Sequence, residues 1–102
     1  KIIQQVGLSH IIALETDSAT RSTIIGLSLA NLTESVVAAS VLVQGSDSTI
    51  GYFMKDIMIP PNSSLRALSA GEKLILAPNN QLQLIADEDA ALDAVISYVD
   101  IV

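Results

Sequence analysis

The chain has no cysteine and no tryptophan, and its 102 residues include only three aromatic ones, Tyr52, Phe53 and Tyr98. The lack of cysteine excludes a disulfide framework, thiol chemistry and cysteine metal sites. With so few aromatic rings, the core must be built from Ile, Leu, Val and Ala, and few large side chains remain to grip a ligand. We therefore expect a domain that works through shape and surface rather than through a reactive centre.

Basic residues are also scarce, with five Lys and Arg against eleven Asp and Glu, which gives a formal net charge of −6. An acidic domain repels phosphate backbones, so we expect no nucleic-acid partner. The apolar runs are far shorter than the roughly 20 residues that cross a bilayer, so we expect no membrane partner.

Half of the residues are apolar, which leaves little charged surface to cover so small a domain. This composition favours burial against partner subunits, as in a homo-oligomer or a larger assembly. The alternative interpretation is an ordinary monomer that is rich in aliphatic residues.

Alternation of apolar and polar residues is the dominant pattern, and it predicts nine short strands. The predicted strands are 2–6, 11–15, 23–30, 36–43, 50–59, 64–68, 73–77, 81–86 and 94–101. Their spacing of about ten residues is typical of a sandwich or barrel. We predict an all-β fold with one small antiparallel β-sandwich, jelly-roll or Ig-like, of about eight to nine strands. Residues 1–102 form a single domain in this interpretation, with 1–23 as an N-terminal arm or an edge hairpin.

The segment Gln81-Leu82-Gln83-Leu84 has the clearest two-residue period. Leu82, Leu84 and Ala86 should face the core, and Gln81 and Gln83 should face outward, because successive side chains of a strand point to opposite faces.

The last predicted strand is apolar on both faces, which indicates burial on both sides. Val95, Val99 and Ile101 share one face with Ser97, whereas Ile96, Tyr98 and Val102 share the other with Asp100. Edge strands near each end of the chain could pair with neighbouring subunits. The predicted interface residues are Ile2, Ile3, Val6, Ile96, Tyr98 and Val102.

The sequence offers little for catalysis, and we expect no enzyme activity and no cofactor. Its one histidine, His10, follows Ser9. Neighbouring residues of a strand point to opposite faces, so the two side chains cannot form a nucleophile and base pair by themselves.

Three consecutive acidic residues, Asp87, Glu88 and Asp89, are the only candidate metal ligands that we single out. Carboxylates suit Ca²⁺, but the alternating ligands, central glycine and closing glutamate of an EF-hand loop are missing. A solvated loop is the simpler interpretation. For the whole segment 87–93 we favour a loop that could include one turn.

Two tripeptides match the N-glycosylation pattern, Asn31-Leu32-Thr33 and Asn62-Ser63-Ser64. Such short patterns are frequent by chance. Turn geometry explains both asparagines more simply, because asparagine side chains bond to nearby backbone.

The order of segments carries a resemblance. A strand Ile24-Ile25-Gly26-Leu27-Ser28-Leu29-Ala30-Asn31 is followed by Thr33-Glu34-Ser35 and a Val-rich strand at 36–43. A Tyr-Phe-Met-Lys-Asp strand ending in Ile59-Pro60 comes next, and Ser63-Ser64-Leu65, Gly71-Glu72-Lys73-Leu74-Ile75-Leu76, Gln81-Leu82-Gln83-Leu84 and the strand 95–102 follow. From Ile24 to Val102 the chain resembles the small β-sandwich virion structural proteins of tailed bacteriophages. Pro78-Asn79-Asn80 stands where that family is expected to have a Gly-Asp-type turn.

This resemblance implies a non-enzymatic protein of the virion, present in many copies as capsid decoration (cement) protein. Its implied partners are the major capsid protein, or connector and tail proteins, together with further copies of itself. A neck, head–tail connector or tail accessory protein is the alternative within the family. A carbohydrate- or receptor-binding module is the alternative from another class, and the shortage of aromatic stacking residues counts against it.

Overall fold

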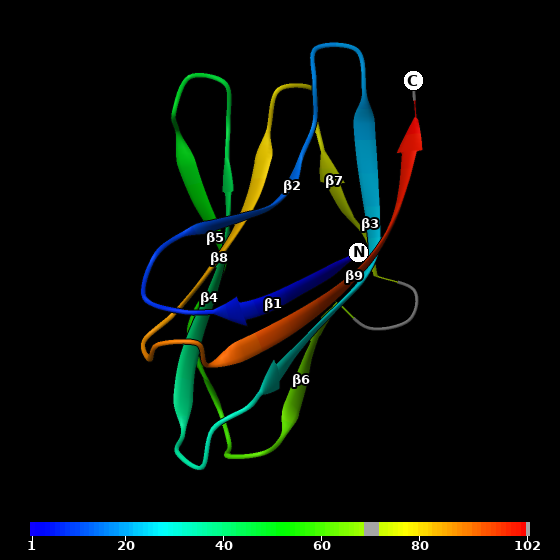
Figure 1. Cartoon of the computed structure of the whole chain (residues 1–102). Coiled ribbons are helices and arrows are strands. Elements are labelled where there is room, and N and C mark those ends of the chain that lie inside the picture. Colours follow the sequence, from blue (N-terminus) through cyan, green and yellow to red (C-terminus); the bar gives the residue numbers. More distant parts are fainter. Residues whose placement is uncertain (69–71, 102) are drawn as a thin grey trace.

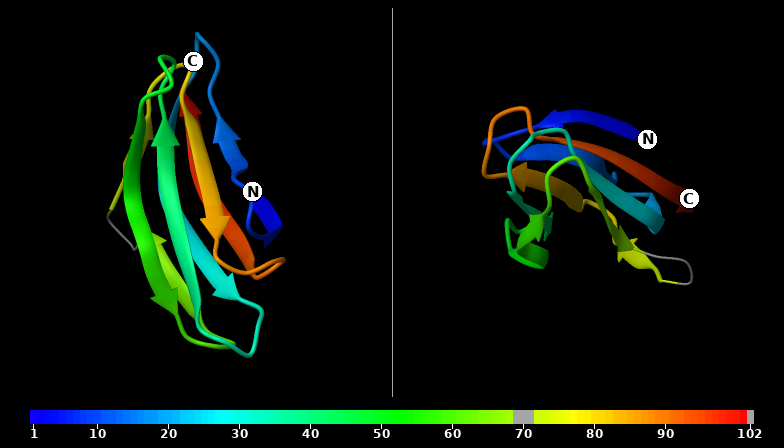
Figure 2. Two further views of the ribbon diagram at one scale, coloured as in Figure 1. Left: turned by 90° about the vertical axis from the view of Figure 1, so that its left-hand side faces the viewer. Right: turned by 90° about the horizontal axis from the view of Figure 1, so that it is seen from below.

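The computed structural model describes residues 1–68 and 72–101, and within them it has nine antiparallel strands and no helix (Figure 1). One sheet, sheet A, contains β1 (Ile2–Val6), β9 (Leu92–Ile101), β3 (Arg21–Asn31), β6 (Ser64–Leu68) and β7 (Leu74–Leu76). The other, sheet B, contains β2 (Ile11–Glu15), β8 (Gln81–Ala86), β4 (Val37–Gln44) and β5 (Ile50–Ile59). The two sheets pack as two layers (Figure 2), which confirms the predicted all-β sandwich.

The strand pairings are nested, which distinguishes the two predicted architectures. β4 pairs with β5, β3 with β6, β2 with β8, and β1 with β9, as in one long hairpin folded over on itself. Sheet A has the order β1-β9-β3-β6, with β7 also on β3, and sheet B has the order β2-β8-β4-β5. This is the double-sheet arrangement of a jelly roll rather than of an immunoglobulin domain.

The core lies between the sheets and is aliphatic, as the lack of aromatic residues predicts. Sheet A contributes alternate residues of β3, among them Ile24 and Leu29, and sheet B contributes Val41, Leu82 and Leu84. These side chains are almost completely buried. The predicted inward set of β8 is therefore confirmed.

Most predicted strand bounds agree with the structure to within one residue, and the exceptions have a common cause. β3 begins at Arg21 instead of residue 23, and β9 begins at Leu92 instead of residue 94. In the register of sheet A, Arg21 lies opposite Ile101 and Asn31 opposite Leu92. Each of these two long strands is thus extended by pairing with the other, a contact that local alternation does not reveal.

Residues 1–23 lie within the two sheets. β1 is an edge strand of sheet A and β2 is an edge strand of sheet B, so the two strands do not pair with each other as an edge hairpin would. Val6, Ala13 and Leu14 are buried in the shared core. This segment is therefore built into the sandwich and is not a projecting arm.

Buried polar side chains join the two sheets at both ends of the sandwich. At one end, Nδ2 of Asn31 in β3 donates to the carbonyl oxygens of Ile59, the last residue of β5, at 3.0 Å, and of Pro60, which follows it, at 3.1 Å. At the other end, the Thr16 hydroxyl donates to the Ala77 carbonyl at 2.7 Å and accepts the Asn80 N–H at 3.0 Å. Both residues are nearly inaccessible to solvent.

Candidate functional site: two exposed apolar surfaces

The outward face of sheet A carries a group of exposed aliphatic side chains from four strands. Strand register assigns them to one face. Ile2 lies opposite Val95, and Val95 lies opposite Ser28, which alternates with the buried residues Leu27 and Leu29. Residues directly opposite one another in antiparallel strands share a face. Ile2 and Val95 therefore point away from the core.

A second row crosses the same face nearer the end of β9. Thr23 alternates with the buried Ile24, and both Val99 of β9 and Ile75 of β7 lie opposite Thr23. Ile101 lies opposite Arg21 in the next outward position. Ile25, at a bulge of β3, is exposed beside this row. The outer apolar face is the set Ile2, Ile25, Ile75, Val95, Val99 and Ile101.

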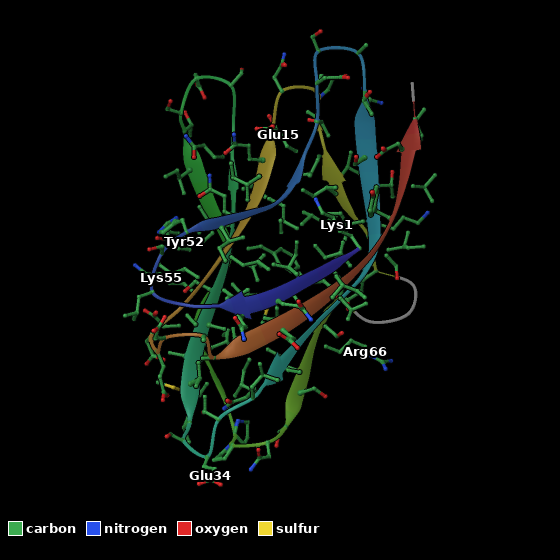
Figure 3. All side chains as sticks on the ribbon, in the orientation of Figure 1. Lys1, Glu15, Glu34, Tyr52, Lys55 and Arg66 are labelled. Carbon is green, nitrogen blue, oxygen red and sulfur yellow. The ribbon has the colours of Figure 1, made fainter. Side chains whose placement is uncertain are left out.

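Charged residues stand at the borders of the outer apolar face. Arg21 marks one end, beside Ile101, and Arg66 lies opposite Ser28 on the β6 side, where Figure 3 shows its side chain extending outward. Asp93, opposite the outward residue Ala30, marks the other end, and its Oδ1 accepts the backbone N–H of Gln5 at 2.9 Å. The face thus has a cation at one end of its long axis and an anion at the other.

The second exposed apolar surface follows β5, an edge strand of sheet B. We call it the β5 rim: Ile50, Tyr52, Phe53 and Met58, all of which are exposed. Met58 is 64% exposed. The Lys55 Nζ lies 5.0 Å from the centre of the Tyr52 ring, a cation–π distance, and the two side chains lie together at the left of Figure 3. Two of the three aromatic residues of the chain therefore face solvent here.

The backbone of β5 is irregular, which makes it a poor template for strand addition. Its register against β4 shifts twice, and Phe53 is the extra residue of one shift, between the pairs Leu42–Tyr52 and Val41–Met54. Asp56 has a φ of 50°, and its N–H donates to Ser40 Oγ of β4 at 2.9 Å. Bulges of this kind protect an edge from pairing with another chain. The β5 rim therefore offers side chains rather than a free backbone ladder.

The predicted interface set must be corrected in part. Val6 and Ile96 are 0% and 1% exposed and belong to the core, so neither can contact a neighbour while the domain is folded. Ile3 packs against the core as well. Ile2 and Tyr98 are exposed, at 68% and 36%, and Val102 lies outside the described residues.

The reason for Ile96 is that sheet B covers the face of β9 that we had selected. Ile96 and Tyr98 do share a face, as predicted, because both lie opposite inward residues of β3, Leu27 and Ile24. That face is the inner one, although Tyr98 on it remains 36% exposed. The open face is the one that carries Val95 and Val99.

The acidic segment forms a non-helical loop that is hydrogen-bonded to a neighbouring strand. The Asp87 carboxylate accepts the Ala38 N–H at 2.9 Å, and the Asp87 N–H donates to the Ala38 carbonyl at 3.0 Å. Gly7 packs so closely that a Cβ there would lie 3.0 Å from the Ala90 nitrogen. Among the described residues, which include Asp87, Glu88 and Asp89, no group of three His, Asp or Glu side chains is placed to hold a metal ion. The simpler interpretation, a solvated loop, is also incomplete, because Asp87 ties this loop to β4.

An open pocket of about 440 Å³ lies at the end of the sandwich near Thr16. Three carboxylates line it, those of Glu15, Asp17 and Asp100, together with Asn79 and Gln81. Each carboxylate has a partner: Gln81 Nε2 donates to Glu15 at 2.6 Å, Ala19 N–H to Asp17, and the Ser22 hydroxyl to Asp100. The Ala19 N–H is the main cause that lowers the pKa of Asp17.

A glutamine network on the outward face of sheet B was missed by sequence reasoning. Gln83 faces outward as predicted, yet it is only 7% exposed. Its Nε2 donates to Gln44 at 2.7 Å and to Gln81 at 2.8 Å, and its Oε1 lies 3.1 Å from His10 Nδ1. It lies opposite Leu42, which is fully buried although it is on the outward face. The only available signal was the glutamine content of these strands, and it does not specify a network.

His10 has an amide partner in this network, and that contact gives it no nucleophile to activate.

Within residues 1–68 and 72–101, no helix is long and apolar enough to cross a membrane. Comparison with families of known proteins, with curated proteins and with solved structures found no match. The function must therefore be argued from the surfaces of this chain.

Proposed function

We propose that this chain is a non-enzymatic structural protein of a virus particle, bound to the head in many copies as a capsid decoration protein. The observation that carries the proposal is the presence of two separate exposed apolar surfaces on one small domain. Large exposed apolar patches mark interaction sites, and two of them allow one subunit to contact both the particle and a neighbouring copy. The outer apolar face lies on sheet A, and the β5 rim lies on an edge of sheet B.

The fold and the resemblance support this setting. Jelly rolls recur in viral capsid domains and also in lectins, so the architecture alone does not choose between them. The resemblance of residues 24–102 to phage virion structural proteins favours the virion. Many weak contacts on a symmetric shell bind through avidity, so each contact can be modest.

The β5 rim is the surface that we assign to the particle. Aromatic residues and methionine are enriched in the buried centres of protein interfaces, and the rim combines Tyr52, Phe53 and Met58. Its irregular backbone allows docking through side chains and discourages uncontrolled strand pairing. The partner is the major capsid protein in this proposal, with connector or tail proteins as the alternative.

The proposal is tested on particles purified by density gradient from cells that carry the gene. Quantitative mass spectrometry should find the protein at a fixed ratio to the major capsid protein. Particles made without the gene should bind the purified protein, and a Phe53→Ser/Met58→Ser variant should lose that binding while it stays folded. Ile12→Ser, an exposed residue on the opposite edge of sheet B, is the matched control. Absence of the protein from the particles would overturn the proposal.

The pocket at the end of the sandwich favours a second candidate, a carbohydrate-binding module. Its carboxylates and amides could accept and donate hydrogen bonds to sugar hydroxyls. Its described lining contains no aromatic ring on which a sugar could stack. A glycan array that shows binding abolished by Asn79→Ala would favour this candidate, and an array without binders would remove it.

A further inference from the structure

We propose that the outer apolar face of sheet A is covered by the same face of a second copy, with the strands of the two copies running in opposite directions. This inference deepens the proposed function by naming the contact between copies. It assigns that contact to the middle and end of β9, and leaves the β5 rim for the particle.

The area of the face is sufficient for a stable dimer. The six side chains of the outer apolar face are all about half exposed or more. At about 100 Å² each they present on the order of 600 Å² per copy, so a symmetric pair buries about 1,200 Å², the lower end of specific interfaces. The small residues between them, Gly26, Ser28 and Ser97, keep the face low enough for a second sheet to approach.

Sheet geometry also suits this contact. Two sheets pack face to face at about 10 Å when aliphatic side chains of both faces interdigitate. The rows formed by Ile2 with Val95, and by Ile75 with Val99, provide ridges of that kind. All six side chains of the outer apolar face are Ile or Val, so no aromatic ring holds the two sheets apart.

Charge selects the orientation of the two copies. Arg21 lies at one end of the face and Asp93 at the other. A two-fold axis that reverses the strand direction places Arg21 of each copy above Asp93 of the other, and the symmetry repeats the contact. An axis that keeps the strand direction would instead place like charges together, which is unfavourable.

Sedimentation equilibrium of the full chain is the first test. We expect a species of twice the chain mass of 10.7 kDa at micromolar concentration. Val99→Lys should raise the dissociation constant by about 100-fold or more, because an unpaired ammonium would be buried at the contact. Met58→Lys, a strand position on the β5 rim that is at least as accessible as Val99, should leave the dissociation constant unchanged. Circular dichroism establishes that both variants are folded.

A charge exchange tests the orientation. Arg21→Asp and Asp93→Lys should each weaken the dimer, and the double variant should recover most of the loss, because the two positions meet across the axis. A wild-type monomer at 100 µM concentration, on the order of the weakest affinity that this account allows, would overturn the inference. The inference would also be overturned if Met58→Lys dissociated the dimer and Val99→Lys left it intact. A dimer that is absent from particles contradicts only the proposed function, and a monomer found on particles contradicts only this inference.

Discussion

At the residue scale, Asn31 is the most constrained polar group of the fold. Its two Nδ2 hydrogens are shared among three nearby carbonyl oxygens, those of Ser35, Ile59 and Pro60. Its Oδ1 accepts from the Thr33 N–H and hydroxyl. The sequence indicated a turn asparagine rather than a glycosylated one, and the burial of this side chain agrees. What the sequence could not reveal is that the same side chain links sheet A to sheet B.

We predict that Asn31→Asp lowers the free energy of unfolding by about 3 kcal/mol or more, because a buried carboxylate would face carbonyl oxygens instead of donating to them. Urea denaturation measures the loss. The matched control is Asn62→Asp, an exposed turn position with a φ of 53° that aspartate tolerates. Equal stabilities of the two variants would contradict the bridging role.

Two turn aspartates should make the free energy of unfolding depend on pH. The Ala19 N–H lowers the pKa of Asp17, and the Thr49 hydroxyl lowers the pKa of Asp47, each below the ordinary value of 3.8. A carboxyl whose pKa is lower in the folded state stabilises the fold above its unfolded pKa, and this contribution disappears as pH falls through the folded pKa.

We therefore predict that the urea midpoint falls as the pH is lowered below 3.8, and that Asp17→Asn with Asp47→Asn makes that fall shallower. Urea denaturation at a series of pH values measures it. Identical slopes for the variant and the wild type would show that these two carboxylates do not cause the dependence.

At the scale of strands, most of the fold could be predicted because alternation and turn residues act locally. The inward side of β8 followed from Leu82 and Leu84 alone. The inward side of β9 did not, because both of its faces are apolar and only the position of sheet B decides between them. Ile96 was assigned to the surface for that reason, and Val6 because β1 was expected to be an edge strand that pairs with a neighbour. The β5 bulges and the glutamine network depend on cross-strand partners, which a single strand does not encode.

The register of β8 gives a prediction at this scale. Leu84→Asp should leave the chain unfolded, because an unpaired charge in the core costs more than the few kcal/mol by which a small domain is stable. Circular dichroism and a thermal melt measure the outcome. Ile12→Asp, on the neighbouring strand and exposed, should remain folded. A cooperative melt for Leu84→Asp would show that the core does not require this position to be apolar.

At the scale of the whole molecule, the exposed apolar surface supports the proposal that partners cover the domain. Among residues 1–68 and 72–101, fifteen large hydrophobic side chains are exposed, and most of them lie on the outer apolar face and the β5 rim. Both surfaces arise from the jelly-roll order, which leaves one face of β9 open and places β5 at an edge.

The most direct test is a cryo-electron microscopy reconstruction of purified particles, compared with particles made without the gene. The account predicts added β-sandwich density at repeated positions of the head lattice, in pairs joined through sheet A and seated on the capsid through β5. A ring on the tail axis would assign the protein to the neck or tail instead. Identical reconstructions with and without the gene would contradict the central claim that this chain is a structural subunit of the particle.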